Sequence, residues 1–197
     1  IITTAEGGLA STNSKKLFEK MQVYRSHGVT RNQKLMTKVS EGPWYYQQIN
    51  LGFNYRMTEL QAALGISQMR RLDEFVQKRH ILKSRYDMLL NDLPIIKPFQ
   101  STNSYSALHL YPIQILLNKV KKSRKQIFNE LRANGVGVNV HYIPIHMQPF
   151  YRKLGFNEGD FPNTEEYYRK VISIPMFQSM SIAQQDEVIT KLINIIR

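Results

Sequence analysis

Asparagine and arginine side chains just before a helical pattern are the first groups in this chain suited to binding chemistry. Asn54 and Arg56 lie in the segment GFNYR, and Thr58 begins the helical pattern directly after them. Because the first turn of a helix carries unpaired N–H groups and a partial positive charge, the Asn54 amide can point at a ligand that approaches this end. Arg56 can clamp an anion. The alternatives are a turn asparagine that bonds its local backbone and an arginine in a structural ion pair.

The segment VNVHYIPIHMQP, residues 138–149, places a second group of polar side chains among apolar ones. Alternate residues of a strand share a face, so Asn139 and His141 are expected to point the same way. A histidine in an apolar strand is often a hydrogen-bonded core residue, and this alternative stands beside a binding role. His141 and His146 are five positions apart, which matches neither a helical i,i+4 metal pair nor a zinc finger, so no metal site is predicted.

The chain carries 27 Lys and Arg against 15 Asp and Glu, a formal net charge of +12. The basic residues are scattered over expected helices, which is typical of solvated faces. The alternative is attraction of an anionic ligand, such as a cofactor phosphate or a nucleotide diphosphate. The sequence contains no RNA-binding signature, zinc spacing or glycine-rich phosphate loop, so a nucleic-acid partner is not expected.

Composition also indicates the cellular compartment of the protein. No run of about 18 apolar residues is present, so no membrane span is expected. The first residues, IITTAEGG, have no basic region of the kind that opens a signal peptide. The chain has no cysteine, which excludes disulfides and thiolate metal sites. These features are typical of a cytoplasmic protein.

The first half is expected to contain short strands and long helices. Two short strands are predicted around Gly7-Gly8, over residues 1–4 and 9–12. A helix is predicted over residues 14–26, a long polar stretch over residues 29–50, and a helical region over residues 58–91. Thr58 and Gln61 have the spacing of a capping box, in which each side chain bonds the other's backbone. Pro94 cannot continue a helix and restricts the residue before it, so we place a domain boundary there.

The second half is expected to be a small α/β sandwich. Strands are predicted over residues 95–96, 108–116, 136–142 and 171–174, and helices over residues 123–134, 164–169 and 181–196. Ser123 with Gln126 and Ser181 with Gln184 repeat the capping-box spacing. The sequence therefore divides into residues 1–93 and 94–197, and its fold class is α/β.

Six segments occur in the order found in one enzyme family: ITTAEGG, RSHG (Arg25–Gly28), GPWYYQQ (Gly42–Gln48), GFNYRMTELQAALG, HYIPIH and FPNTEEYY (Phe161–Tyr168). Over essentially its whole length the chain resembles the DegT/StrS sugar aminotransferases, which use pyridoxal 5'-phosphate (PLP). The resemblance implies the C-terminal part of a fold-type I transferase. Residues 1–93 would end the large PLP-binding domain and residues 94–197 would form the small domain. GPWYYQQ and GDFPNTEEYY favour the pseudaminic acid branch, and sister sugar transaminases stay open.

The resemblance also implies that the catalytic lysine lies outside this chain. In the family, the lysine that holds PLP as a Schiff base, the carboxylate for the ring nitrogen and the ring-stacking group precede a segment like Ile1–Gly8. Lys15, Lys16 and Lys20 lie on an expected amphipathic helix with solvated spacing, whereas such a lysine must be desolvated or otherwise tuned. The isolated chain is therefore expected to be inactive.

By resemblance, Asn54 would reach across a homodimer interface to the cofactor and substrate of the other subunit, with Arg56 as a second cofactor-binding residue. The substrate-binding residues would be Asn139, Val140, His141 and Tyr142. The full enzyme would move an amino group from glutamate to C4 of a UDP-linked 4-keto-6-deoxy sugar. The alternative is a non-catalytic fragment that binds a nucleotide sugar or a partner.

Overall fold

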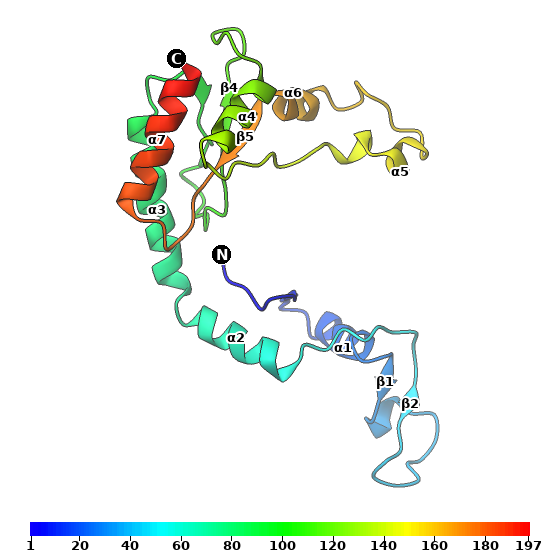
Figure 1. Cartoon of the computed structure of the whole chain (residues 1–197). Helices are drawn as coiled ribbons and strands as arrows, with labels where there is room; N and C mark the ends of the chain where they lie inside the picture. Colours follow the sequence, from blue (N-terminus) through cyan, green and yellow to red (C-terminus); the bar gives the residue numbers. More distant parts are fainter. The chain divides into compact units, whose positions relative to one another are not determined.

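The computed structural model describes all residues 1–197 and consists of two compact units (Figure 1). The first unit is residues 2–71, and the second is Leu72–Arg197 together with Ile1. This division falls before helix α3 (Leu72–Leu89), whereas the boundary expected from sequence follows it. The reason is that Leu82 and Tyr86 of α3 are buried in the core of the second unit. The domain limits 1–93 and 94–197 stay a prediction for the complete protein.

The first unit contains few regular elements: α1 (Lys15–Tyr24), β1 (Val29–Thr30), η1 (Gln33–Leu35), β2 (Gln47–Gln48) and α2 (Glu59–Met69). The strands β1 and β2 pair antiparallel, within the stretch that the sequence left as a long polar connection. Ser14 caps α1 by accepting a bond from Leu17 N. Thr58 and Gln61 form the predicted capping box at the start of α2.

The two strands predicted around Gly7-Gly8 do not form. A strand needs a partner for its backbone groups, and this segment lies along α2 instead. Gln61 Nε2 donates to Glu6 O at 2.9 Å. A Cβ atom at Gly65 would lie 3.1 Å from Thr4 Cγ2, so the glycine permits this close approach. Side-chain contact with α2 therefore replaces strand pairing.

The second unit is an α/β structure, as predicted. Besides α3 it contains β3 (Ile95–Ile96), β4 (Tyr111–Ile115), α4 (Arg124–Ala133), η2 (Ile145–Met147), α5 (Pro149–Arg152), α6 (Pro162–Lys170), β5 (Val171–Ile174) and α7 (Ile182–Ile196). The sheet has the order β3-β4-β5 and is antiparallel throughout. Helix α7 contacts both α3 and α4 (Figure 1). Their apolar faces enclose one core, which includes Ile113, Ile127 and Leu192.

Most elements of this unit lie where the sequence predicts them, and the capping boxes of α4 and α7 are both present. Two strands differ. The strand expected over residues 136–142 is reduced to a single bridge between Asn139 and Ser173. Asn139 Oδ1 accepts from Val140 N at 2.8 Å, so that N–H is unavailable to a partner strand. Strand β4 begins at Tyr111 rather than Leu108, because Leu108 adopts a left-handed φ of 53°.

None of the helices combines the length and the apolar character needed to cross a membrane.

Candidate functional site

The segment that carries Asn54 is fastened to the end of α1 by its backbone. Asn54 forms an isolated bridge with Ser26. Tyr55 N donates to Arg25 O at 2.9 Å, and His27 N donates to Phe53 O at 2.9 Å. The Asn54 side chain is exposed and bonds no backbone group, so it is not the self-bonded turn residue that the sequence left open. Its amide is available to a ligand.

Arg56 does not form the structural ion pair that was the alternative to anion binding. No carboxylate pairs with its guanidinium, and its one polar neighbour is His27, whose Nε2 lies 3.5 Å from Nη2. Asn54 and Arg56 line a cavity of about 690 Å³, together with residues 6–10 and Gln61. An exposed amide and an unpaired guanidinium in one cavity are suited to binding an anion.

These residues fit the anionic end of PLP but not its covalent attachment. Arg56 and Asn54 offer donors to phosphate oxygens, whereas no lysine lines the cavity. Lys15, Lys16 and Lys20 are exposed on α1, as the sequence indicated. A solvated lysine lacks the desolvated surroundings that activate an amine nucleophile. The cavity therefore offers hydrogen-bond donors for an anion and no amine for a Schiff base.

Asn139 and His141 come together on Ser173, a residue of β5 that is buried. Asn139 N donates to Ser173 O at 3.2 Å, and Ser173 N donates to Asn139 O at 2.8 Å. His141 Nδ1 lies 2.8 Å from Ser173 Oγ, and its Nε2 lies 3.5 Å from Asn139 Nδ2. The two side chains thus share one side of the segment, as expected, although the segment is not a full strand. They belong to the second unit, whereas Asn54 and Arg56 belong to the first.

Val140 and Tyr142 have different surroundings. The Val140 N–H is already used by Asn139 Oδ1, so any ligand contact would come from its side chain or carbonyl group. Tyr142 is 71% exposed, and its ring meets the His141 ring edge-on at 4.6 Å. His141 itself is half-buried. The side chains of His141 and Tyr142 therefore face solvent, while the backbone at Asn139 is held by its hydrogen bonds to β5.

The core histidine of this region is His146, which is 7% exposed. Its Nε2 lies 2.8 Å from Glu165 Oε1, and Gly159 N donates to the same oxygen at 2.7 Å. The His146 contact, followed by the Gly159 bond, lowers the pKa of Glu165 below its ordinary 4.5. The pair fastens α6 to η2 and so supports the chain that follows Tyr142.

We expect the variant Glu165→Gln to lower stability at neutral pH and to lose this effect in acid. A carboxylate with a lowered native pKa stabilises the fold above its unfolded pKa, and the contribution disappears as pH falls through the native value. Urea unfolding of both proteins at pH 7 and below pH 4 measures the difference. A stability difference that is equal at the two pH values would contradict this assignment.

Comparison with known proteins identifies the family. Residues 1–193 match the model of the DegT/DnrJ/EryC1/StrS aminotransferase family, and the chain belongs to it. It is 34% identical to the spore coat polysaccharide biosynthesis protein SpsC of Bacillus subtilis, covering 100% of this chain and 51% of that protein. It is also 34% identical to the UDP-4-amino-4,6-dideoxy-N-acetyl-beta-L-altrosamine transaminase of Campylobacter jejuni, over 92% of this chain and 46% of the relative.

A solved structure agrees with this assignment. The PseC aminotransferase of Helicobacter pylori, involved in the biosynthesis of pseudoaminic acid, superposes with a TM-score of 0.81 and 27% identity, over 94% of this chain and 47% of that one. The partial fold-type I transferase expected from sequence is thereby confirmed. The chain spans about half the length of the curated relatives that it matches. Aminotransferases of this family use PLP, and the solved relatives include a PLP form.

Proposed function

We propose that this chain is the C-terminal portion of a PLP-dependent nucleotide-sugar aminotransferase. In the complete enzyme, glutamate would supply the amino group, which would pass to C4 of a UDP-linked 4-keto-6-deoxy sugar in pseudaminic acid-type biosynthesis. The observation that carries the proposal is that Asn139 and His141 both bond Ser173 and lie next to each other. They do so in a chain that the family model matches over residues 1–193. The transaminase of Campylobacter jejuni supports the choice of sugar.

In this proposal the two groups of residues have separate roles. Asn54 and Arg56 hold an anionic group of the cofactor or substrate through their free amide and guanidinium groups, Asn54 across a homodimer interface. Asn139, His141 and Tyr142 orient the nucleotide sugar, with Val140 lining the same segment. The contact of Ser173 Oγ with His141 Nδ1 fixes the ring and leaves Nε2 toward Asn139 and the ligand. PLP, when bound, supplies the electron sink for amino transfer.

The sugar is tested by offering the complete protein several nucleotide-linked 4-keto sugars with glutamate. The proposal expects the UDP-linked 4-keto-6-deoxy sugar to give the highest kcat/KM. The equal identity to SpsC makes another polysaccharide precursor the competing substrate. Preference for a different nucleotide or a different keto position would keep the enzyme class and reject this sugar.

The complete protein is proposed to be a cytoplasmic homodimer. Helix α2 supports this, because it leaves Leu60, Ile66 and Met69 exposed at 85%, 58% and 54%. An exposed apolar surface of this kind is usually buried against a partner subunit or against another part of the same protein. Light scattering of the complete protein measures the state directly.

The isolated chain is expected to form no specific covalent adduct with PLP, because its lysines in the first unit are solvated. The chain is mixed with PLP, treated with borohydride and analysed by mass spectrometry. Sparse labelling spread over several lysines is the expected result. Stoichiometric labelling of one lysine, abolished by substituting that residue, would contradict the expectation and would favour catalysis by this chain alone.

A further inference from the structure

The guanidinium of Arg79 is buried in the second unit, which also contains Asn139, His141 and Ser173. The proposed function explains neither its charge nor its position. Arg79 is 5% exposed and has no carboxylate partner. Its Nη1 donates to the carbonyl oxygens of Leu108, His109 and Met176 at 3.2, 2.9 and 2.9 Å, and its Nη2 donates to Gln178 Oε1 at 3.2 Å. These oxygens carry only partial charges, so the positive charge of Arg79 is not neutralised locally.

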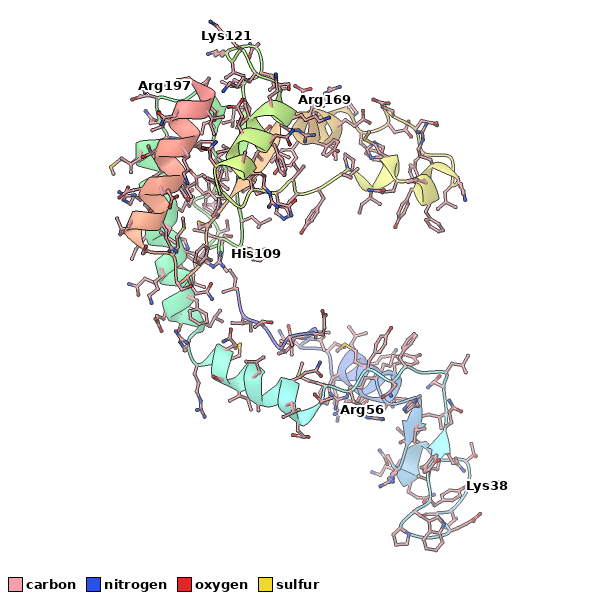
Figure 2. The ribbon with its side chains drawn as sticks, in the orientation of Figure 1. Lys38, Arg56, His109, Lys121, Arg169 and Arg197 are labelled. Carbon is pink, nitrogen blue, oxygen red and sulfur yellow. The ribbon has the colours of Figure 1, made fainter.

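These bonds fix the backbone of His109 immediately before β4. Leu108 adopts a φ of 53°, a left-handed conformation that costs energy for a residue with a Cβ atom. Arg79 holds this turn by bonding the carbonyl groups on both of its residues. The His109 side chain is exposed and makes no hydrogen bond in the chain. The structure thus holds a free imidazole on a rigid support (Figure 2).

The hydrogen bonds that hold His109, through Arg79, and His141 end on β5 and on the residues just after it. Ser173, in β5, bonds Asn139 and His141, while Met176, two residues after the end of β5, accepts from Arg79. Partial desolvation of the ring lowers the pKa of His109 below its ordinary 6.5, and the positive charges of Arg79 and His141 add to this effect. A cluster of this sign favours a negatively charged ligand.

We propose that His109 is a further substrate-contacting residue of the site formed by Asn139 and His141, and that it donates a hydrogen bond to an anionic group of the ligand. The inference rests on the proposed function, in which that group is the diphosphate of the nucleotide sugar. A neutral imidazole offers one N–H donor to a phosphate oxygen, and Arg79 acts as a positioning residue behind it. This role could not be predicted from sequence, because His109 is a lone histidine within an expected strand.

The test is the variant His109→Ala in the complete protein, which removes the N–H donor. UDP binding is measured by calorimetry, and KM and kcat are measured with the nucleotide sugar. We expect the UDP dissociation constant and KM to rise about tenfold, as for the loss of one charge-assisted bond. The glutamate half-reaction and the melting temperature should not change. The control is Lys121→Gln, which removes a full charge at the opposite end of the second unit (Figure 2) and should leave UDP affinity unchanged.

The outcomes separate this inference from the proposed function. A folded His109→Ala protein with unchanged UDP affinity and unchanged KM overturns the inference, and so does a wild-type protein that does not bind UDP. A wild-type protein that binds UDP without transferring an amino group, and whose binding weakens in His109→Ala, supports the inference and contradicts the proposed function. An equal loss of affinity in Lys121→Gln would show that only net charge matters, and it also overturns the inference.

Discussion

Replacing His141 by alanine in the complete enzyme is expected to lower kcat/KM for the nucleotide sugar about 100-fold, while the half-reaction with glutamate keeps its rate. Removal of the imidazole deletes a ligand contact and frees Ser173 Oγ, which is bonded to His141 Nδ1 at 2.8 Å. A hydrogen bond to a charged ligand group is worth about 1.5–3 kcal/mol, and about 2.7 kcal/mol corresponds to a 100-fold change in rate. The amino donor reacts at the cofactor, whose covalent anchor lies outside this chain in the proposal.

The two half-reactions are measured separately, with a melting curve for each protein. His146→Gln is the matched control, because His146 is a buried histidine of the same segment and is bonded to Glu165. It should lower the melting temperature and leave the balance between the half-reactions unchanged. Equal damage to both half-reactions in His141→Ala, with a lowered melting point, would remove His141 from the site and restore its reading as a core residue.

Replacing Arg79 by methionine is expected to destabilise the second unit by about 3 kcal/mol. The carbonyl groups of Leu108 and Met176 are buried and would lose their donor, and an unsatisfied buried acceptor costs about 1–3 kcal/mol. Methionine keeps most of the apolar stem in place. The loss would therefore report the polar end of the side chain rather than a cavity.

Urea unfolding of the two proteins at neutral pH measures this free energy. Arg132→Met is the control, because Arg132 is an exposed arginine near the end of α4 and its replacement should change stability by less than about 0.5 kcal/mol. If Arg79→Met were as stable as the control, the guanidinium would not organise the turn at Leu108. The support proposed for His109 would then fail as well.

Local signals in the sequence predicted the helices well. A capping box requires only two side chains three residues apart, and all three predicted boxes are present, at Thr58, Ser123 and Ser181. Gly28, four residues after the last residue of α1, is similar, because its φ of 72° is a left-handed conformation that favours glycine. Such features depend on neighbouring residues and are visible in sequence.

Two other features were harder to predict from the pattern of residues. The expected strand at residues 136–142 is a single bridge, because Asn139 satisfies its neighbour's N–H with its own side chain. Arg79 lies in α3, within the helical region that the sequence predicts over residues 58–91. Nothing local to the helix shows that its guanidinium meets carbonyl groups 29 and 97 residues away. Non-local polar contacts of this kind follow from the fold, and they also decide which histidines are free to bind.

Amino transfer by the complete protein tests the central claim most directly. Purified protein supplied with PLP is incubated with glutamate and a UDP-linked 4-keto-6-deoxy sugar, and 2-oxoglutarate and the amino sugar are quantified together. We predict equal amounts of the two products, both of which depend on PLP. A folded protein that binds PLP but forms no 2-oxoglutarate with any nucleotide-linked keto sugar would contradict the claim.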